Sequence, residues 1–250
     1  MQMATKKLKC WHIYHSGTAI YVPEEETLHI FDYYRQEGDR FPGHWQKNFS
    51  PRKTYIYVSH GHGDHYSSDI FSWSEKFADL RYILSSDLQS KTASYRNQNL
   101  PLKYLSPGDK ITAGGIIIKA YESTDEGISL LIEEGRRKYF HAGDLNWWDW
   151  ESFSPEERKR EERDYKKTVD KLQNAGIDLA FVPVDPRLGE SYHLAAEYFM
   201  RTVKPEVLVP IHIADNYSIT SRFRQKFADM ETEIIEISRP GEEFDIELRG

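Results

Sequence analysis

The stretch "VSHGHGDHYS" (residues 58–67) places three histidines and one aspartate within six positions, although the whole chain of 250 residues has only ten histidines. It directly follows the apolar run "YIYV" (55–58), which predicts a β-strand. Loops at strand ends are where α/β proteins usually carry their functional groups. The stretch therefore predicts a site at the end of a strand.

The spacing of these side chains favours a metal site. His60 and His62 are two residues apart, so in extended backbone they point the same way and can bind one ion. Asp64 and His65 can offer a second pair of ligands, and the two interleaved glycines are expected to permit a turn and a close backbone approach. Imidazole and carboxylate suit zinc, iron or manganese rather than calcium. The alternative, a polar helix start with incidental histidines, explains this spacing less well.

Two further candidate ligands end later strands. Asp144 closes "YFHAGD" (139–144), and His212 closes "EVLVPIH" (206–212). A carboxylate at Asp144 could bridge two ions about 3.5–4 Å apart, as two-metal hydrolases require. His212 could complete a site with Asp64 and His65. Either residue alone could also be an ordinary polar group at a strand end.

The rest of the chain alternates between strand and helix patterns, which predicts one α/β domain over residues 1–250 with strands in two groups, before and after about residue 115. The helix signal is strongest after Ser154, where Pro155 suits the first helical position and Glu157 completes a capping box. Strands are expected over 10–14, 18–22, 28–32, 55–59, 81–85, 116–121, 128–133, 138–141, 179–184, 207–211, 233–237 and 244–248, and helices over 68–78, 154–174, 194–202 and 220–227.

Composition limits the classes of partner. The single cysteine, Cys10, excludes an intrachain disulfide and a site built from several thiolates. The formal charge of −7 argues against a nucleic-acid partner, because phosphate binding needs a basic face. The N-terminal "MQMATKKLKC" lacks the apolar stretch of a signal peptide, and no window approaches the roughly 18 apolar residues of a membrane span. A cytoplasmic protein without a membrane partner is expected, and its oligomeric state stays open.

The motifs together resemble the metallo-β-lactamase superfamily of metal-dependent hydrolases. The resemblance extends from "HSG" (15–17) to "PIH" (210–212) and includes "FD" (31–32), the HxHxDH cluster, a strand-end aspartate and a strand-end histidine in that order. It implies a four-layer αββα sandwich that binds two divalent ions, zinc or else manganese or iron, at one edge between two sheets. Three segments resemble the branch that includes L-ascorbate-6-phosphate lactonase: "STDEG" (123–127), "HAGDLNWW" (141–148) and "DPR" (185–187).

The chain departs from the superfamily pattern at one ligand. A third histidine usually completes the first metal site, but no histidine lies between His65 and His141, and Ser123 takes the corresponding position. Asp125 could replace it as a carboxylate ligand, which is the alternative we favour. His141 could also replace it, although it more readily supports the site from behind. The third alternative holds the ion with His60, His62, Asp144 and water.

The resemblance also implies a reaction and the roles of several residues. A metal-activated water would attack a small ester, lactone or phosphoester, with Asp144 holding the ions and Asp64 able to transfer a proton. Asp32 could orient a ligand histidine, and His15 could contact the substrate or support the site. The remaining candidates, each with an equally plausible structural role, are Arg187 for a phosphate or carboxylate, His193 for the substrate, and Trp147, Trp148 and Trp150 as a wall or lid.

Other functions are compatible with the same motifs. One is a nuclease or phosphodiesterase of the same superfamily. Another is an iron-binding redox protein without hydrolase activity, in which ligands have drifted toward carboxylates. The last is a relative with the fold but no catalytic activity. Metal content and a panel of substrates distinguish these functions from a hydrolase of small molecules.

Overall fold

The computed structural model describes residues 7–34, 51–77, 79–98 and 100–249. The chain divides into two compact units, the first formed by residues 1–105 and 239–250 and the second by residues 106–238. Each unit contains one seven-stranded sheet, and each is described by itself. The single domain expected from the sequence remains a prediction.

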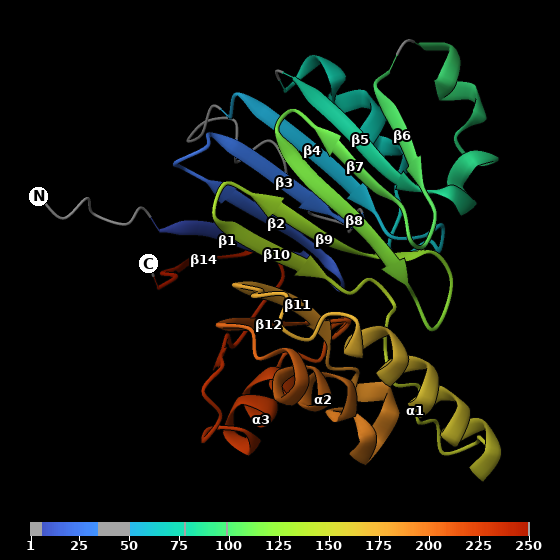
Figure 1. Ribbon diagram of the computed structural model, residues 1–250, viewed down its shortest axis with the longest axis vertical. Helices are drawn as coiled ribbons and strands as arrows, with labels where there is room; N and C mark the ends of the chain where they lie inside the picture. The colour runs from blue at the N-terminus through green and yellow to red at the C-terminus, as the bar shows by residue number, and fades with distance from the viewer. Residues whose placement is uncertain (1–6, 35–50, 78, 99, 250) are drawn as a thin grey trace, which may run out of the picture. The chain divides into compact units, whose positions relative to one another are not determined.

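The sheet of the first unit is half antiparallel and half parallel. Its strands follow the order β14-β1-β2-β3-β4-β5-β6, antiparallel from β14 to β3 and parallel from β3 to β6 (Figure 1). The parallel strands end at the same edge of the sheet, which gathers the loops that follow them. The bounds are β1 (Leu8–Tyr14), β2 (Gly17–Val22), β3 (Thr27–Phe31), β4 (Lys53–Val58), β5 (Leu80–Ser85), β6 (Leu102–Leu105) and β14 (Glu242–Ile246).

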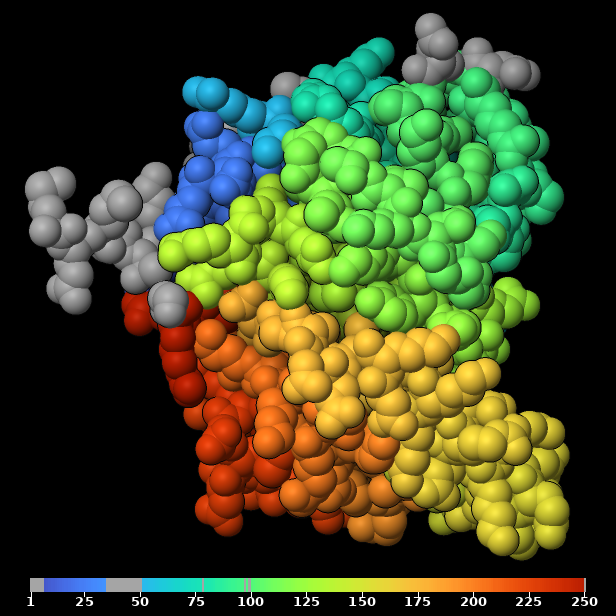
Figure 2. Space-filling view, viewed as in Figure 1, coloured from blue at the N-terminus to red at the C-terminus, as the bar shows by residue number. Residues whose placement is uncertain are grey.

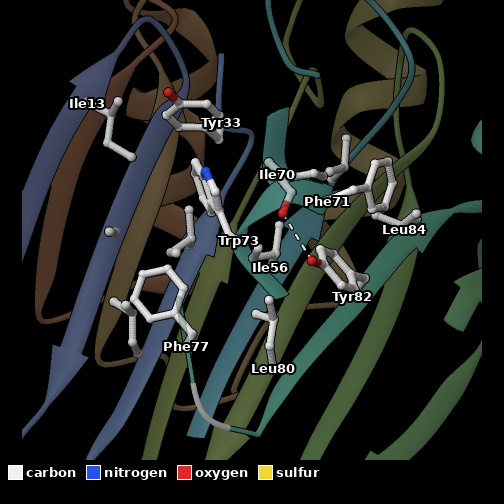
Figure 3. Close-up of a cluster of buried hydrophobic side chains, with 14 of the residues drawn as sticks. Ile13, Tyr33, Ile56, Ile70, Phe71, Trp73, Phe77, Leu80, Tyr82 and Leu84 are labelled. Atoms are coloured by element: carbon white, nitrogen blue, oxygen red, sulfur yellow. Dashed lines mark hydrogen bonds between the residues drawn. The ribbon is translucent and has the colours of Figure 1, made fainter. Parts of the chain in front are cut away.

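A cluster of aromatic and aliphatic side chains covers one face of this sheet. The 3₁₀ helix η2 (Ser68–Glu75) contributes Ile70, Phe71 and Trp73, which pack against Ile56 and its neighbours on the strands (Figure 3). Tyr82 on β5 donates its hydroxyl to the carbonyl of Ile70 at 3.0 Å, as the dashed line in Figure 3 marks. This packing fixes β4 and β5, and therefore the loops at their carboxyl ends. Two shorter 3₁₀ helices follow, η3 (Ser86–Gln89) and η4 (Ala93–Gln98).

The sheet of the second unit repeats the same pattern. Its strands follow the order β13-β12-β11-β10-β9-β8-β7, antiparallel from β7 to β10 and parallel from β10 to β13. The central strands β11 and β12 are buried along their whole length, as expected for parallel strands. The bounds are β7 (Lys110–Ala113), β8 (Ile116–Glu122), β9 (Ile128–Glu134), β10 (Arg137–His141), β11 (Leu179–Pro183), β12 (Val207–Ile211) and β13 (Glu233–Ile234).

Three α-helices and one 3₁₀ helix complete the second unit: α1 (Pro155–Asp170), η5 (Pro186–Ser191), α2 (Leu194–Val203) and α3 (Ser218–Lys226). The predicted capping box of α1 is present, with the Ser154 side chain accepting from Glu157 and the Glu157 side chain accepting from Ser154. Most of α1 is charged and lies at the surface, where its yellow residues are visible in Figure 2. Tyr165 anchors α1 to α2 through a 2.7 Å hydrogen bond to the Ala195 carbonyl.

The structure differs from the expected elements in several places; the strand expected over 233–237, for example, is only Glu233–Ile234, and the 3₁₀ helices η3, η4 and η5 were not expected. The segment expected as a helix over 68–78 is the 3₁₀ helix η2 (Ser68–Glu75), with Ile70, Phe71 and Trp73 buried. Helix α1 ends at Asp170 rather than Asn174, where hydrogen bonds to the third preceding residue take over. Strands β6 and β7 were not expected; both lie at sheet edges, where one partner strand suffices and the apolar signal is weak.

Stability is expected to fall in mild acid because of His12. This residue lies fully buried in β1, and burial, with a smaller contribution from His15, lowers its pKa from 6.5 to about 3. Below about pH 6.5, His12 becomes protonated in the unfolded chain but stays neutral in the folded chain. The folded state therefore loses stability as the pH falls from 6.5 toward 3. At pH 5 the expected loss is about 2 kcal/mol. Urea unfolding at pH 7 and pH 5 measures this loss in the free energy of unfolding. Between the two pH values, the His12→Gln variant should lose about 2 kcal/mol less than the unmodified protein. An equal loss in both proteins would contradict the prediction.

Among the described residues, no helix is long and apolar enough to cross a membrane.

Candidate metal centre

In the first unit, the parallel strands bring Asp32 and the histidine cluster to one edge of the sheet. Asp32 directly follows β3, and His60 follows β4, its parallel neighbour. The backbone of Asp32 has a φ of 45°, in the left-handed region that non-glycine residues seldom adopt. His15 and, in the second unit, His212 share this conformation, with φ of 55° and 63°. Strain of this kind concentrates at functional sites.

Asp32 is a buried carboxylate with three hydrogen bonds. One oxygen, Oδ1, accepts from the backbone N–H of Ser59 at 2.7 Å. The other, Oδ2, accepts from the Ser59 hydroxyl at 2.7 Å and from Nδ1 of His65 at 2.9 Å. A proton held on Nδ1 by this carboxylate leaves Nε2 of His65 with a lone pair. A carboxylate in this position can hold His65 in the form in which imidazole binds a metal, and the predicted role of Asp32 as a supporting carboxylate remains a prediction.

Ser59 extends the same arrangement to His60. The hydroxyl of Ser59 gives its proton to Asp32, so it accepts from Nδ1 of His60, which lies 2.9 Å away. His60 then carries its lone pair on Nε2, and this atom lies 3.0 Å from Nδ1 of His62. Two ring nitrogens so close together can bind one ion, because metal–nitrogen bonds to zinc are about 2.0–2.1 Å long. His60 and His62 thus converge as predicted.

Asp64 and His15 lie beside His65. The Asp64 carboxylate is 3.4 Å from Nε2 of His15, and this contact, with the nearby His65, lowers the pKa of Asp64 well below its usual value. One potential ligand atom from each of these three residues lies within 4.8 Å of the others. The Asp64 side chain is 48% exposed, whereas the two histidines are buried. A partly exposed carboxylate beside two buried imidazoles can bind a cation that enters from solvent.

In the second unit, a histidine lies between two carboxylates. Nε2 of His212 is 3.2 Å from Asp144, which follows β10, and Nδ1 of His212 is 3.1 Å from Asp185, which follows β11. Burial alone would lower the pKa of His212, but its hydrogen bonds to Asp144 and Asp185 outweigh burial and raise it. Burial likewise opposes charge on Asp185, yet His212 and Arg187 bring the pKa of Asp185 down to about 2. A divalent ion could replace the proton between Asp144 and His212, because imidazole binds metals in its neutral form.

The loop at Ser123 brings Asp125 near Asp144. Carboxylate oxygens of the two aspartates lie within 4.8 Å of one another. Thr124 fixes this loop, since its hydroxyl lies 3.2 Å from the Asp144 carbonyl and 2.6 Å from the Asn146 carbonyl. The Ser123 hydroxyl accepts from the backbone of Asp125 at 3.3 Å. Ser123 therefore shapes the loop, and Asp125 is placed to serve as a ligand beside Asp144.

His141 and His193 have other contacts. Nδ1 of His141 accepts from the Gly143 backbone at 3.1 Å and so supports the turn that precedes Asp144. His193 lies before α2, with its Nδ1 3.0 Å from Glu197 and its ring 5.6 Å from Phe227. Among the described residues, neither histidine belongs to a group that could hold a metal. Their roles at a metal or substrate site remain predictions.

The predicted aromatic residues divide into two sets. The ammonium of Lys166 lies over the Trp147 ring, 4.7 Å from its centroid, so Trp147 packs against helix α1. Trp148 lies 5.7 Å from the His212 ring, edge to face, and stacks on Trp150 at 5.9 Å. Arg187 lies 5.6 Å over Trp150 and forms a bidentate pair with Asp185 at 2.7 and 3.0 Å. The structural pairing of Arg187 is thus present, and its binding of an anion remains a prediction.

Sequence reasoning missed two residues of this site. Ser59 was treated as part of a strand, and Asp185 only as a partner of Arg187. Ser59, together with Asp32, orients His60. Asp185 orients His212. The available signal was their position, because Ser59 directly follows β4 and Asp185 lies two residues after β11.

The chain is similar to one curated metal-dependent hydrolase. No family model matches the chain. A UPF0173 metal-dependent hydrolase of Staphylococcus saprophyticus is 23% identical over 204 residues, which cover 76% of this chain and 80% of that protein.

Solved structures identify the fold. The metallo hydrolase Igni18 of Ignicoccus hospitalis matches with a TM-score of 0.61 and 16% identity, over 98% of this chain and 100% of that one. The metallo-β-lactamase fold protein YhfI of Bacillus subtilis matches with a TM-score of 0.59 and 12% identity, over 96% and 100%. This chain has the metallo-β-lactamase fold. The predicted fold class is confirmed, whereas membership of the metallo-β-lactamase superfamily and the resemblance to the L-ascorbate-6-phosphate lactonase branch remain predictions.

Proposed function

We propose that this protein is a metal-dependent hydrolase that acts on a small ester, lactone or phosphoester. One observation supports this function above the others. His60, His65 and His212 each have Nδ1 within hydrogen-bond distance of an oxygen, which leaves Nε2 of each ring as the atom that could bind a metal. Histidines that bind metals almost always have their other ring nitrogen held in this way. Histidines with a purely structural role in a core would not all need an oxygen partner on Nδ1.

The ligand sets predicted from the sequence would hold two divalent ions. His60 and His62 would hold the first ion with Asp144, and Asp125 would take the place of the usual third histidine. Asp64, His65 and His212 would hold the second ion, with Asp144 shared between the two. Nitrogen and carboxylate oxygen without thiolate suit zinc and also manganese or iron. The name of the curated relative, a metal-dependent hydrolase, supports the same class of function.

A divalent ion at such a centre lowers the pKa of water and supplies a nucleophile near neutral pH. The chain's own residues contribute orientation and charge. Asp32 and Ser59 hold the imidazoles of His65 and His60 in the required tautomers, and Asp185 does so for His212. Trp148 and Trp150 form an apolar surface beside His212, against which a small substrate could pack. The net charge of −7 disfavours long polyanionic substrates.

Elemental analysis of protein purified without chelator or nickel tests the proposal first. We expect about two ions of zinc or manganese per chain, as a two-metal hydrolase requires. His60→Ala should lower the count by about one ion, because it removes a ligand of the first ion only. A panel of esters, lactones and a generic phosphodiester should then show metal-dependent turnover that a chelator abolishes.

Three outcomes would contradict the proposal. Bound iron without hydrolysis of any ester, lactone or phosphoester would favour a redox protein. Metal-dependent cleavage of nucleic acid and the generic phosphodiester, with no turnover of any small ester, lactone or phosphomonoester, would favour a nuclease or phosphodiesterase. Protein that binds no divalent ion at all would favour a relative that has the fold without the activity.

A further inference from the structure

The backbone between His60 and His62 is held by two side chains from another loop. The backbone N–H of Gly61 donates to Oδ2 of Asp87 at 2.8 Å. The carbonyl of Gly61 accepts from the ammonium of Lys91. The first contact holds the peptide that joins His60 to Gly61, and the second holds the peptide that joins Gly61 to His62. Both peptide links between the two histidines are therefore fixed from outside.

Asp87 and Lys91 are well placed because their own segment is anchored. Asp87 lies in η3 and Lys91 in the turn that follows it, and both side chains reach the Gly61 backbone. Leu88, between them, is fully buried in the core cluster. Thr92 is also buried, and its hydroxyl bonds to the Leu88 carbonyl at 2.8 Å. The segment follows β5, whose parallel pairing with β4 brings it beside the histidine loop.

This contact explains why a glycine lies between the two histidines. A Cβ atom at Gly61 would lie 3.0 Å from both Asp87 Oδ2 and Lys91 Nζ, and 3.4 Å from Leu88. Gly61 does not have a positive φ, so a side chain there would meet a limit of space and not of backbone conformation, and the ends of Asp87 and Lys91 would have to shift. A Cβ at Gly63, by contrast, would meet nothing within 4 Å. The expectation of a close backbone approach thus holds at Gly61 and not at Gly63.

We propose that Asp87 and Lys91 are positioning residues that set the separation of His60 and His62 for one metal ion. This inference rests on the proposed metal-dependent function. Neither residue takes part in the set of metal ligands; each acts only through the Gly61 backbone. Both side chains are exposed, so their loss leaves no buried charge unpaired. Their removal should therefore loosen the metal site without unfolding the chain.

The test uses four variants of the full chain and zinc as the probe. Lys91→Met and Asp87→Ala remove one contact each, whereas Lys91→Arg and Asp87→Asn keep a donor and an acceptor. Lys103→Met, an exposed lysine on β6, serves as the matched control. The rate at which zinc-loaded protein loses its metal to a chelator is measured for each, together with the thermal midpoint of the metal-free protein.

We expect Lys91→Met and Asp87→Ala to lose one zinc ion about 10–100 times faster than the unmodified protein, as for partners that orient metal ligands. The conservative variants and the Lys103 control should stay close to the unmodified rate. The thermal midpoints of unfolding of the metal-free variants should match that of the metal-free unmodified protein. Unchanged rates, or a lower midpoint that accounts for faster loss, would overturn the positioning role while the proposed function stands. If the unmodified protein itself binds no zinc, manganese or iron, both proposals fail.

Discussion

The Asp144→Asn variant is expected to lose both metal ions and at least about 10³-fold in kcat/KM. A bound metal stabilises charge in the transition state by several kcal/mol, and each 1.36 kcal/mol corresponds to about tenfold in rate. Asp144 is the residue proposed to be shared between the two ions. Asparagine has the same size but lacks the negative charge, so both ions should bind more weakly at once.

The surroundings of Asp144 explain why no neighbour can replace it. Its side chain is buried, and one oxygen lies 3.2 Å from Nε2 of His212. A carboxylate oxygen of Asp125 lies within 4.8 Å of one of Asp144, but Asp125 is exposed to solvent. An amide at position 144 would also place either an N–H or a weaker acceptor beside His212, so the ligand set around that histidine changes as well.

Metal content and kinetics of the variant check this prediction, with Asp229→Asn as the control because Asp229 is an exposed aspartate of the same unit. Retention of two ions with near-normal turnover would show that Asp144 is not the shared ligand. Loss of a single ion would place Asp144 at one ion only, and the proposed ligand sets would need to be redrawn.

The positions of much of the candidate site could be predicted because its polar side chains come within a few residues of the ends of apolar strands. His60, Asp144 and His212 all stand just after a β-strand whose residues are mostly buried, which is a local pattern. The roles of Ser59 and Asp185 could not be predicted in the same way. They depend on contacts with residues 27 positions away in the sequence, Asp32 and His212 respectively, and such contacts exist only once the parallel strands are paired.

The fold shows the same division between local and distant information. The central strands and the capped start of α1 follow from apolar runs and the Ser154–Glu157 capping box. The edge strands β6 and β7 pair on one side only, so their sequences carry little signal. The sequence also did not reveal that both sheets change from antiparallel to parallel at one strand, β3 in the first and β10 in the second.

That change explains where the functional aspartates lie. Asp32 directly follows β3, and Asp144 comes shortly after β10, so each begins the loops at the carboxyl end of a parallel set. The next strands bring Ser59 to Asp32 and Asp185 to the histidine that contacts Asp144. Parallel pairing thus gathers the polar groups of each unit at one edge of its own sheet.

The Asp32→Asn variant is expected to weaken the binding of both metal ions by about 10–100-fold, through the tautomers of two histidines. The amide oxygen can still accept from the Ser59 backbone, but the amide N–H groups then replace Oδ2. His65 must accept at Nδ1, so its proton moves to Nε2, where the metal would bind. The Ser59 hydroxyl must turn its proton toward His60, which forces the same change there.

Ser59→Ala separates these two effects. It removes the link from Asp32 to His60 but leaves the 2.9 Å bond from Asp32 to His65 intact. We therefore expect Ser59→Ala to weaken only the ion held by His60, and Asp32→Asn to weaken both. The loss of folding stability should be about 1–3 kcal/mol for Asp32→Asn, where a buried group loses its partner, and about 1 kcal/mol for Ser59→Ala. Zinc titration of each variant, with nitrogen NMR of the histidine rings to report the tautomers, measures both effects. Unchanged tautomers in Asp32→Asn would show that this carboxylate contributes only to stability, and the orientation of the ligand histidines would then have to come from elsewhere.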